Sequence, residues 1–463
     1  MKSRIRRRTV VALAALLLAT PLAPSAQAAE TDAHVEGTLP SGASYVMDKP
    51  ESWNGTVLLF SHGYTPAGLP NPARNAPDDA TKSILLKEGY ALIGSSYASN
   101  GWAVSEAVPD QLATLDAFTS RFGKARQTIA WGASYGGLVT SMIAERHPDR
   151  ISGSLSLCGL LQGGVANWNS TLDPVFALKT LLAPDADIRL TGLGSQAAAA
   201  EAAGTLAGAV GEAQNTASGR ARIALAAALH NIPGWNDTSQ TKPEPADWDA
   251  QQANQFQAVM GLVQFPAFSW RQEAESRVGG NMSWNTGVDY AAMLHNSPLY
   301  KEVSELYAKA GLSLTKDLTT LNGAPRIAAD TQAVDKMALT SSFTGRLAKP
   351  QLTVHTTGDG LIPVQAESAY NRAVTAAGAA PLLRQAFVEN AGHCTFSSAE
   401  GVAALHTLET RITTGHWQGT GPAALNARAT EVDPSEPARY VSYRPAQYPR
   451  PYDLAHPTDR YRP

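Results

Sequence analysis

The alternation of strand-like and helix-like segments is the sequence feature that most constrains this fold. From Thr56 onwards, short apolar runs such as "TVLLFSHG" and "QTIAWGAS" alternate with amphipathic helical segments such as "DDATKSILLKEGY". Strands separated by helices form a parallel sheet that is covered by helices on both faces. The apolar runs show no polar alternation, which agrees with this architecture because its strands are buried on both sides.

The alternation is interrupted by a long Ala-rich region. This region is helical in pattern and extends from beyond Cys158 to about Leu347, and the alternation resumes at Pro350 with "QLTVHTTGD". We therefore predict one α/β domain with a helical domain inserted between two of its strands. The predicted parts are the α/β core at 29–160 and 348–418, the insertion at 161–347, and an extended Pro/Tyr/Arg-rich tail at 419–463.

The first 28 residues have the pattern of a secretory signal peptide. A basic start is followed by an apolar run at residues 10–18 and by Ala-Gln-Ala just before Ala29. This pattern predicts cleavage near Ala28 and a secreted protein. A membrane anchor is the alternative, but a bilayer span needs about 20 apolar residues. The Arg7-Arg8 pair fits a twin-arginine signal and an ordinary signal equally well.

The net charge excludes some classes of partner. The full chain carries 37 basic and 40 acidic residues, and five of the basic residues lie in the predicted signal peptide. The mature chain would thus hold 32 basic and 40 acidic residues, a net charge of −8. A mildly acidic surface argues against nucleic acid or an anionic membrane as a partner. No other stretch has the length and hydropathy for stable membrane insertion.

A serine lies between glycines where a predicted strand becomes a predicted helix. The sequence "GASYG" at residues 132–136 fits the G-x-S-x-G nucleophile elbow, and the strand before it and the helix after it supply the required context. The elbow lifts the serine hydroxyl above the sheet, and the next N–H, at the helix N-terminus, stabilises negative charge. We therefore predict that Ser134 is a nucleophile; a tight turn without chemistry is the alternative.

A serine nucleophile needs a histidine base and an orienting acid. In this type of fold the three residues follow in the order Ser, acid, His. Asp359 lies just after the first strand beyond the insertion, although Asp-Gly also favours a simple turn. Among the ten histidines, His393 alone satisfies both order and position, in the loop "NAGHCTFSS" after the last predicted strand. We predict a triad of Ser134, Asp359 and His393.

The predicted oxyanion hole consists of two backbone N–H groups. His62-Gly63 ends an apolar strand at the place where a second oxyanion donor belongs. The N–H groups of Tyr64 and Tyr135 are therefore the predicted donors. No His/Cys/Asp cluster has metal-ligand spacing, and "GASYGG" is not a phosphate-binding loop, so we predict neither a metal nor a cofactor.

Several motifs together resemble a known superfamily. "GASYGG…HPDR", "HTTGDGLIPV" and "AGHC" resemble the α/β-hydrolases over residues 56–417. This resemblance implies an α/β-hydrolase fold, a cap domain inserted after the sixth strand, and a Ser-His-Asp mechanism. "GASYGG" and "HPDR" also resemble prolyl-oligopeptidase-like serine peptidases. "GHC" is similar to tannase and feruloyl-esterase relatives, but Ala133 and Tyr135 flank the serine where those relatives have a cysteine.

Three functions are compatible with these motifs. The leading hypothesis is a secreted hydrolase of small-molecule or polymer esters. In this hypothesis aromatic residues of the insertion line an acyl pocket; the alternative is that they form the insertion's own core. The second is an amidase or peptidase, including one of the proline-iminopeptidase kind, in which an acid of the cap binds the substrate amine. The third is an inactive scaffold, against which the complete triad argues. The aromatic residues are Trp168, Trp235, Trp248, Phe256, Phe265, Phe268, Trp270 and Trp284, and the acids include Glu244, Asp247, Asp249, Glu273 and Glu275.

The two cysteines are predicted to form a disulfide. An even number of cysteines in an exported protein favours pairing. Cys158 ends the strand beside the nucleophile strand, and Cys394 follows His393, whose loop must return to the same edge of the sheet to reach Ser134. Two separate buried thiols are the alternative.

Overall fold

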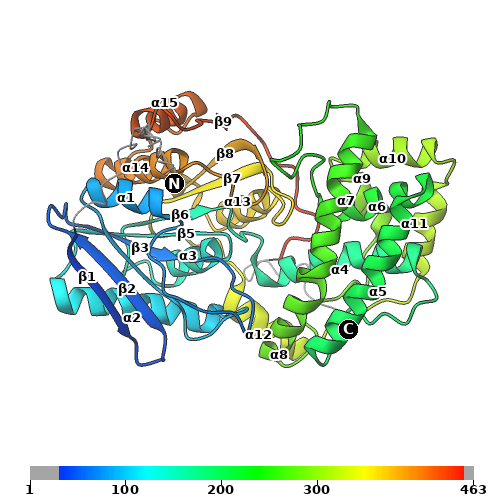
Figure 1. Cartoon of the computed structure of the whole chain (residues 1–463), viewed down its shortest axis with the longest axis horizontal. Coiled ribbons are helices and arrows are strands. Elements are labelled where there is room, and N and C mark those ends of the chain that lie inside the picture. Colours follow the sequence, from blue (N-terminus) through cyan, green and yellow to red (C-terminus); the bar gives the residue numbers. More distant parts are fainter. Residues whose placement is uncertain (1–30, 453–463) are drawn as a thin grey trace, which may run out of the picture.

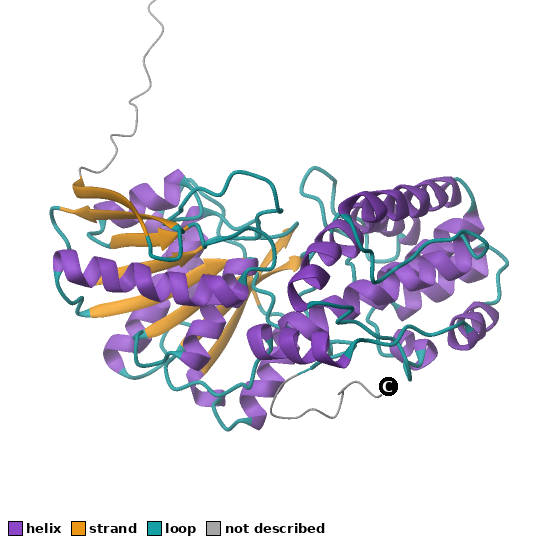
Figure 2. Ribbon diagram, turned by 90° about the horizontal axis from the view of Figure 1, so that it is seen from below, coloured by secondary structure: helices purple, strands orange, loops and turns teal. Residues whose placement is uncertain are grey.

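The computed structural model describes residues 31–452. The predicted signal peptide at 1–28 and the last residues of the predicted tail, 453–463, lie outside the described residues. Figure 1 shows two bodies side by side: a twisted sheet covered by helices on the left and a helical body on the right. Figure 2 shows from below that helices lie on both faces of the sheet.

The nine described strands form one sheet, in the order β1-β2-β4-β3-β5-β6-β7-β8-β9. The strands from β4 to β8 in that order pair in parallel, while β1 and β2 at one end of the sheet and β9 at the other pair antiparallel. The prediction of a mostly parallel sheet is therefore confirmed. The bounds are β1 Thr31–Thr38, β2 Ser44–Pro50, β3 Thr56–Ser61, β4 Ala91–Ser95, β5 Gln127–Ala133, β6 Gly153–Leu157, β7 Gln351–Gly358, β8 Leu383–Ala391 and β9 Tyr440–Val441.

The sheet has an apolar core on each face. Leu115 of α2 and Val139 of α3 belong to one core, and Leu85 of α1 and Leu405 of α14 belong to the other. Burial of apolar side chains on both faces is the main force that holds helices on the sheet. The helices of this domain are α1 Asp79–Lys87, α2 Val104–Phe122, α3 Tyr135–Arg146, α13 Ala366–Ala376, η2 Ala380–Leu382, α14 Ser398–Thr414 and α15 Pro422–Val432.

The helical body lies between β6 and β7 in the chain. It has an apolar core of its own, in which Leu172, Leu225 and Phe268 are fully buried. We call residues 163–341 the cap. The predicted boundaries, 160/161 and 347/348, fall in the segments that join the cap to the two strands. Its helices are α4 Gly163–Leu182, α5 Gln196–Gln214, α6 Ala217–His230, α7 Trp248–Gln264, η1 Pro266–Trp270, α8 Arg271–Val278, α9 Tyr290–His295, α10 Tyr300–Lys309, α11 Leu314–Gly323 and α12 Thr331–Ser341.

The prediction of an extended tail from residue 419 is wrong for its first part. Pro422 starts α15, which buries Leu425 and Ala429, and β9 then pairs with β8. Proline suits the first turn of a helix, because the N–H groups of that turn have no acceptor within the helix and the N–H that proline lacks is not needed. Within residues 31–452, no helix combines the length and hydropathy that a bilayer span requires.

After β9 the chain is extended and lies against the cap. Arg450 donates hydrogen bonds to both carboxylate oxygens of the buried Asp173 in α4, at 3.0 and 3.1 Å. The hydroxyl of Tyr448 donates to Ser170 Oγ at 2.7 Å, also in α4. Figure 1 shows this red segment passing from the sheet to the cap. The segment therefore joins the two bodies at a second place besides the chain connections of the cap itself.

Candidate active site

Ser134 occupies a strained turn between β5 and α3. Its φ of 58° lies in the left-handed region, which side chains other than glycine rarely adopt. A Cβ on Gly132 would lie 2.4 Å from the carbonyl oxygen of Gly136, and one on Gly136 would lie 1.9 Å from that of Ser61. Both positions thus exclude any side chain, which is the steric reason for the two glycines of the motif.

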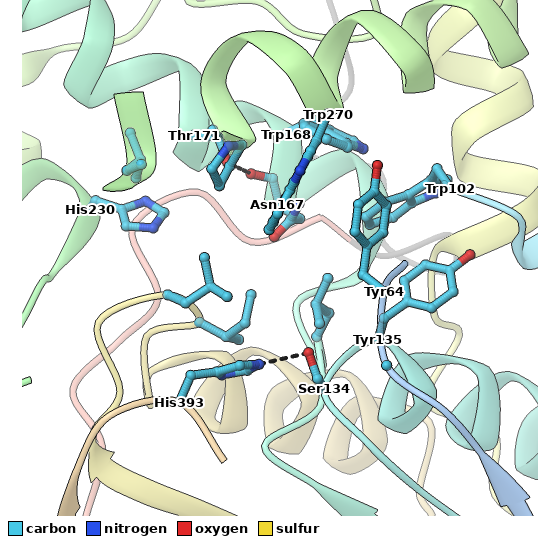
Figure 3. A pocket seen from close by; sticks show the side chains of 16 residues that line it. Tyr64, Trp102, Ser134, Tyr135, Asn167, Trp168, Thr171, His230, Trp270 and His393 are labelled. Atoms are coloured by element: carbon cyan, nitrogen blue, oxygen red, sulfur yellow. Dashed lines mark hydrogen bonds between the residues drawn. The ribbon is translucent and has the colours of Figure 1, made fainter. Parts of the chain in front are cut away.

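The structure brings the three predicted triad residues together. Ser134 Oγ lies 2.6 Å from His393 Nε2, and His393 Nδ1 lies 2.6 Å from Asp359 Oδ2. Ser134 follows β5, Asp359 follows β7 and His393 follows β8, so all three residues lie at the carboxyl edge of the parallel sheet. Figure 3 shows the hydrogen bond between Ser134 and His393 at the floor of a cavity. In this arrangement His393 can accept the serine proton while Asp359 fixes its orientation.

Asp359 is fully buried, but it is surrounded by donors. Its Oδ1 accepts hydrogen bonds from the N–H groups of Leu361 and Ile362, each at 2.9 Å. Burial by itself would raise the pKa of Asp359, but the charge of His393 and the hydrogen bonds from His355 and His393 lower the pKa well below its usual range. Asp359 is therefore a carboxylate at neutral pH.

A second histidine, outside the predicted triad, lies behind Asp359. His355 is fully buried; its Nε2 lies 3.0 Å from the carbonyl oxygen of Ile362 and 3.3 Å from Asp359 Oδ2, and its Nδ1 lies 3.3 Å from Glu367 Oε1. Burial lowers the pKa of His355, but the hydrogen bonds to Asp359 and Glu367 outweigh burial and raise it to about 10. Because both ring nitrogens face acceptors, His355 is an imidazolium. Its position four residues before Asp359 was the only signal in the sequence.

We expect His355→Gln to shift the pH dependence of activity. The substitution removes a positive charge that lowers the pKa of Asp359, so the pKa of this carboxyl should rise. The expected mechanism needs the Asp359 carboxylate, so the acid limb of the kcat/KM profile should move to higher pH. His147→Gln, at the end of α3, is the control. An unchanged acid limb in His355→Gln would contradict this role.

The predicted oxyanion donors lie near Ser134. Gly63, which precedes Tyr64, passes so close that an added Cβ would lie 3.8 Å from Ser134 Cβ. Within residues 31–452 the backbone N–H groups of Tyr64 and Tyr135 have no acceptor. Two unpaired N–H groups beside a nucleophile suit an oxyanion. The ring of His62 is held by the carbonyl oxygens of Gly63 and Ser96, at 2.7 and 3.1 Å, so it shapes this loop.

A disulfide joins Cys158 and Cys394, with 5.4 Å between their Cα atoms. It ties the end of β6 to the loop that carries His393, and Cys394 Sγ lies 3.5 Å from His393 Nε2. The two sulfurs and His393 are near enough to one another to hold a metal ion. However, the sulfurs are bonded to each other and offer no thiolate ligand.

A cavity of about 240 Å³ lies between Ser134 and the cap, and we call it the cap cavity. Of the eight aromatic residues singled out in the sequence, Trp168 and Trp270 line it. Phe268 lies in the core of the cap instead, and Phe265 is exposed. Figure 3 shows the rings across the cavity from the Ser134–His393 pair. The complete lining is Gly63, Tyr64, Trp102, Ser134, Tyr135, Leu160, Asn167, Trp168, Thr171, His230, Leu262, Pro266, Trp270, Leu361, Ile362 and His393.

A serine elbow at the carboxyl edge of a mostly parallel sheet, with a helical insertion after β6, defines an α/β-hydrolase. The sequence model of the prolyl oligopeptidase family (Peptidase_S9) matches residues 91–177. The chain is also 31% identical over 430 residues to the o-phthalyl amidase of Xanthobacter agilis, which covers 88% of this chain and 93% of the amidase. The chain therefore belongs to the α/β-hydrolase superfamily and to the family of this amidase.

Solved structures of hydrolases also match the chain at low similarity. An esterase from Aspergillus oryzae is 12% identical, with 83% of this chain and 80% of the esterase covered and a TM-score of 0.40. An acylaminoacyl peptidase, solved in complex with Z-Gly-Gly-Phe-chloromethyl ketone, is 10% identical with a TM-score of 0.36. The match covers 83% of this chain but spans only 41% of that peptidase's length.

Proposed function

We propose that this chain is a secreted serine hydrolase that cleaves the amide bond of small aromatic carboxamides through an acyl-enzyme. The observation that carries the proposal is the pair of 2.6 Å hydrogen bonds from Ser134 to His393 and from His393 to Asp359, at the floor of an apolar cavity. Export is proposed from the pattern of residues 1–28, and the disulfide suits an oxidising compartment.

The proposed reaction has two half-reactions. Ser134 Oγ attacks the amide carbonyl carbon as its proton moves to His393 Nε2, and the N–H groups of Tyr64 and Tyr135 stabilise the oxyanion. The C–N bond then breaks, and His393 gives the proton to the departing amine. In the second half-reaction, a water molecule attacks the ester of Ser134 with His393 as the base, and the carboxylic acid leaves. The sum is amide plus water to acid plus amine.

The cap cavity favours an aromatic acyl group. A cavity of about 150 Å³ holds benzene, so about 240 Å³ leaves room for one substituted ring. Trp102, Trp168 and Trp270 contribute rings to the wall, and the lining contains no Asp or Glu. The name of the 31%-identical relative, an o-phthalyl amidase, supports an aromatic acyl group and an amide bond.

An aminopeptidase is less well supported, because none of the five cap acids singled out in the sequence lines the cap cavity. Glu273 forms an ion pair with Arg277 and accepts a hydrogen bond from the N–H of Trp102 at 2.8 Å. Glu275 accepts from the N–H groups of Gly192 and Leu193. Asp247 caps α7, and Asp249 pairs with Lys309. Among the described residues, no carboxylate is thus available in this cavity for a substrate ammonium group.

Ester hydrolysis is the second candidate, and the apolar lining of the cap cavity supports it. Esters and amides of one acid give the same acyl-enzyme, so a site that binds the acyl group serves both. The purified mature protein should be assayed on benzamide-type substrates, the matching aryl esters and amino-terminal peptides. Amide turnover that is inhibited by a fluorophosphonate supports the proposal. Turnover of esters alone would leave ester hydrolysis as the function, and peptide turnover alone would overturn both.

We expect Trp270→Ala to change acyl preference more than stability. Trp270 is partly exposed, lines the cap cavity and packs on Tyr64 with 4.7 Å between ring centroids. Removing the ring enlarges the cavity, so kcat/KM should fall about tenfold for a benzoyl substrate and less for a naphthoyl one. Phe265→Ala, on the exposed side, is the control. If Trp270→Ala instead lowers Tm without changing the ratio of the two substrates, Trp270 is a structural residue.

A further inference from the structure

A second cavity, of about 360 Å³, adjoins Ser134 on the side away from the cap. It lies between the sheet and the N-terminal ends of α1 and α14, and we call it the outer cavity. Gly63, Ser134 and His393 line both cavities. The nucleophile therefore lies where the two cavities meet, so the two sides of a scissile bond at Ser134 each face a separate space.

The outer cavity holds one uncompensated positive charge. Within residues 31–452, Arg74 makes no hydrogen bond or ion pair. Asp78, the one carboxylate among the described residues of the lining, is already engaged: Oδ1 accepts from the N–H of Thr81 at 2.7 Å, and Oδ2 accepts from its hydroxyl at 2.9 Å. Both ring nitrogens of His62 face carbonyl oxygens. The Arg74 guanidinium is thus available to an anion.

The backbone that carries Arg74 is fixed. A Cβ on Gly94 of β4 would lie 2.0 Å from the carbonyl oxygen of Arg74, so the loop packs directly on the strand. The next residue, Asn75, is buried and donates hydrogen bonds to Asp48 Oδ2 at 2.6 Å and to the carbonyl oxygen of Leu92 at 3.2 Å. A guanidinium on a fixed backbone loses less entropy when it binds a carboxylate than one on a free loop.

The two cavities differ in their access to solvent. Every residue that lines the cap cavity is buried or half-buried, whereas Arg74, Pro77 and Asp78 of the outer cavity are exposed. In an acyl-enzyme reaction the acyl group stays bound through both half-reactions, while the amine leaves after the first. The enclosed cap cavity therefore suits the acyl group, and the open outer cavity suits the amine.

We infer that the outer cavity is the amine subsite and that Arg74 binds a carboxylate on the amine part of the substrate, as in an N-aroyl amino acid. This inference rests on the proposed amide hydrolysis and specifies its substrate class. Arginine and a carboxylate form paired, charge-assisted hydrogen bonds, and amino acids present their carboxylate close to the scissile nitrogen. The reaction is N-aroyl amino acid plus water to aromatic acid plus free amino acid.

Binding can be tested apart from turnover. The Kd values of N-benzoylglycine and the neutral N-benzoylglycinamide should be measured calorimetrically on Ser134→Ala and on Ser134→Ala/Arg74→Met. We expect Arg74→Met to raise the Kd of N-benzoylglycine about tenfold or more and to leave the Kd of N-benzoylglycinamide unchanged. Arg74→Lys should retain part of the effect, and Arg346→Met, an exposed arginine outside both cavities, is the control. Equal Kd values with and without Arg74, or no binding of N-benzoylglycine, would overturn the inference.

Turnover then separates this inference from the proposed function. The kcat/KM values of N-benzoylglycine, N-benzoylglycinamide and a phthalamate, whose carboxylate is on the acyl part, should be compared in wild type and Arg74→Met. A loss confined to N-benzoylglycine supports the amine subsite, and a loss confined to the phthalamate refutes it. If wild type hydrolyses none of the three while N-benzoylglycine still binds through Arg74, the amidase proposal fails and the carboxylate site stands.

Discussion

Replacing Ser134 with alanine should reduce turnover by at least about 10³-fold and leave the fold intact. The hydroxyl oxygen lies 2.6 Å from His393 Nε2, and losing the nucleophile removes the acyl-enzyme route altogether. Alanine fits the elbow, because Ser134 already carries a Cβ at its left-handed φ and alanine adds no atom there. Steady-state kinetics and a thermal melt measure the two effects.

Fluorophosphonate labelling gives an independent readout of the same site. Wild type should take up one label, at Ser134, and Ser134→Ala should take up none. Ser304→Ala, at a half-buried serine of α10 far from the triad in sequence, is the matched control and should behave as wild type in all three measurements. More than about a tenth of wild-type turnover in Ser134→Ala would show that another group is the nucleophile.

Among the proposed variants, removal of the disulfide should cause the largest loss in the free energy of unfolding. The bond closes a loop with a sequence separation of 236 residues, which contains the whole cap. In the chain-entropy model, opening such a loop lowers the free energy of unfolding by about 5 kcal/mol. We expect Cys158→Ser/Cys394→Ser to melt several degrees below wild type. Calorimetry and denaturant titration measure this loss.

The same disulfide should affect activity before it affects global folding. It holds the residue after His393 against the end of β6, so reduction frees the loop that positions the imidazole. Under mild reductant, wild type should lose activity while its far-ultraviolet circular dichroism is unchanged. The double variant is the control, because reductant has no bond to break in it. Equal melting temperatures of wild type and the double variant would contradict the stabilising role.

Two ion pairs hold helices of the cap against other parts of the chain. Arg277 of α8 forms an ion pair with Glu106 of α2 at 2.8 Å, and Arg450 of the C-terminal segment pairs with Asp173 of α4 at 3.0 Å. Both pairs join segments more than 150 residues apart, at separations of 171 and 277. The cap cavity is thus enclosed by a cap that is held at α4 and at α8.

The sequence by itself determined the parallel sheet, the elbow and the position of the insertion. These features leave a local pattern in the sequence: unbroken apolar runs such as β3 require burial on both faces. The turn needs its glycines because a Cβ on Gly132 would meet the carbonyl oxygen of Gly136, and one on Gly136 would meet that of Ser61 in the neighbouring strand β3. The order of Ser134, Asp359 and His393 along the chain was enough to select residues that the structure places in hydrogen-bonding contact.

The tertiary structure alone decided which side chains share a space. The charge of His355 follows from Glu367 and Asp359, and the proposed role of Arg74 follows from a loop that places it in a cavity with Ser134, 60 positions further along the chain. Trp270 lines the cap cavity while Phe268, two residues earlier, lies in the core of the cap. Periodicity predicts that a residue is buried, but the neighbours of a buried or charged group are set by long-range packing, which no local pattern encodes.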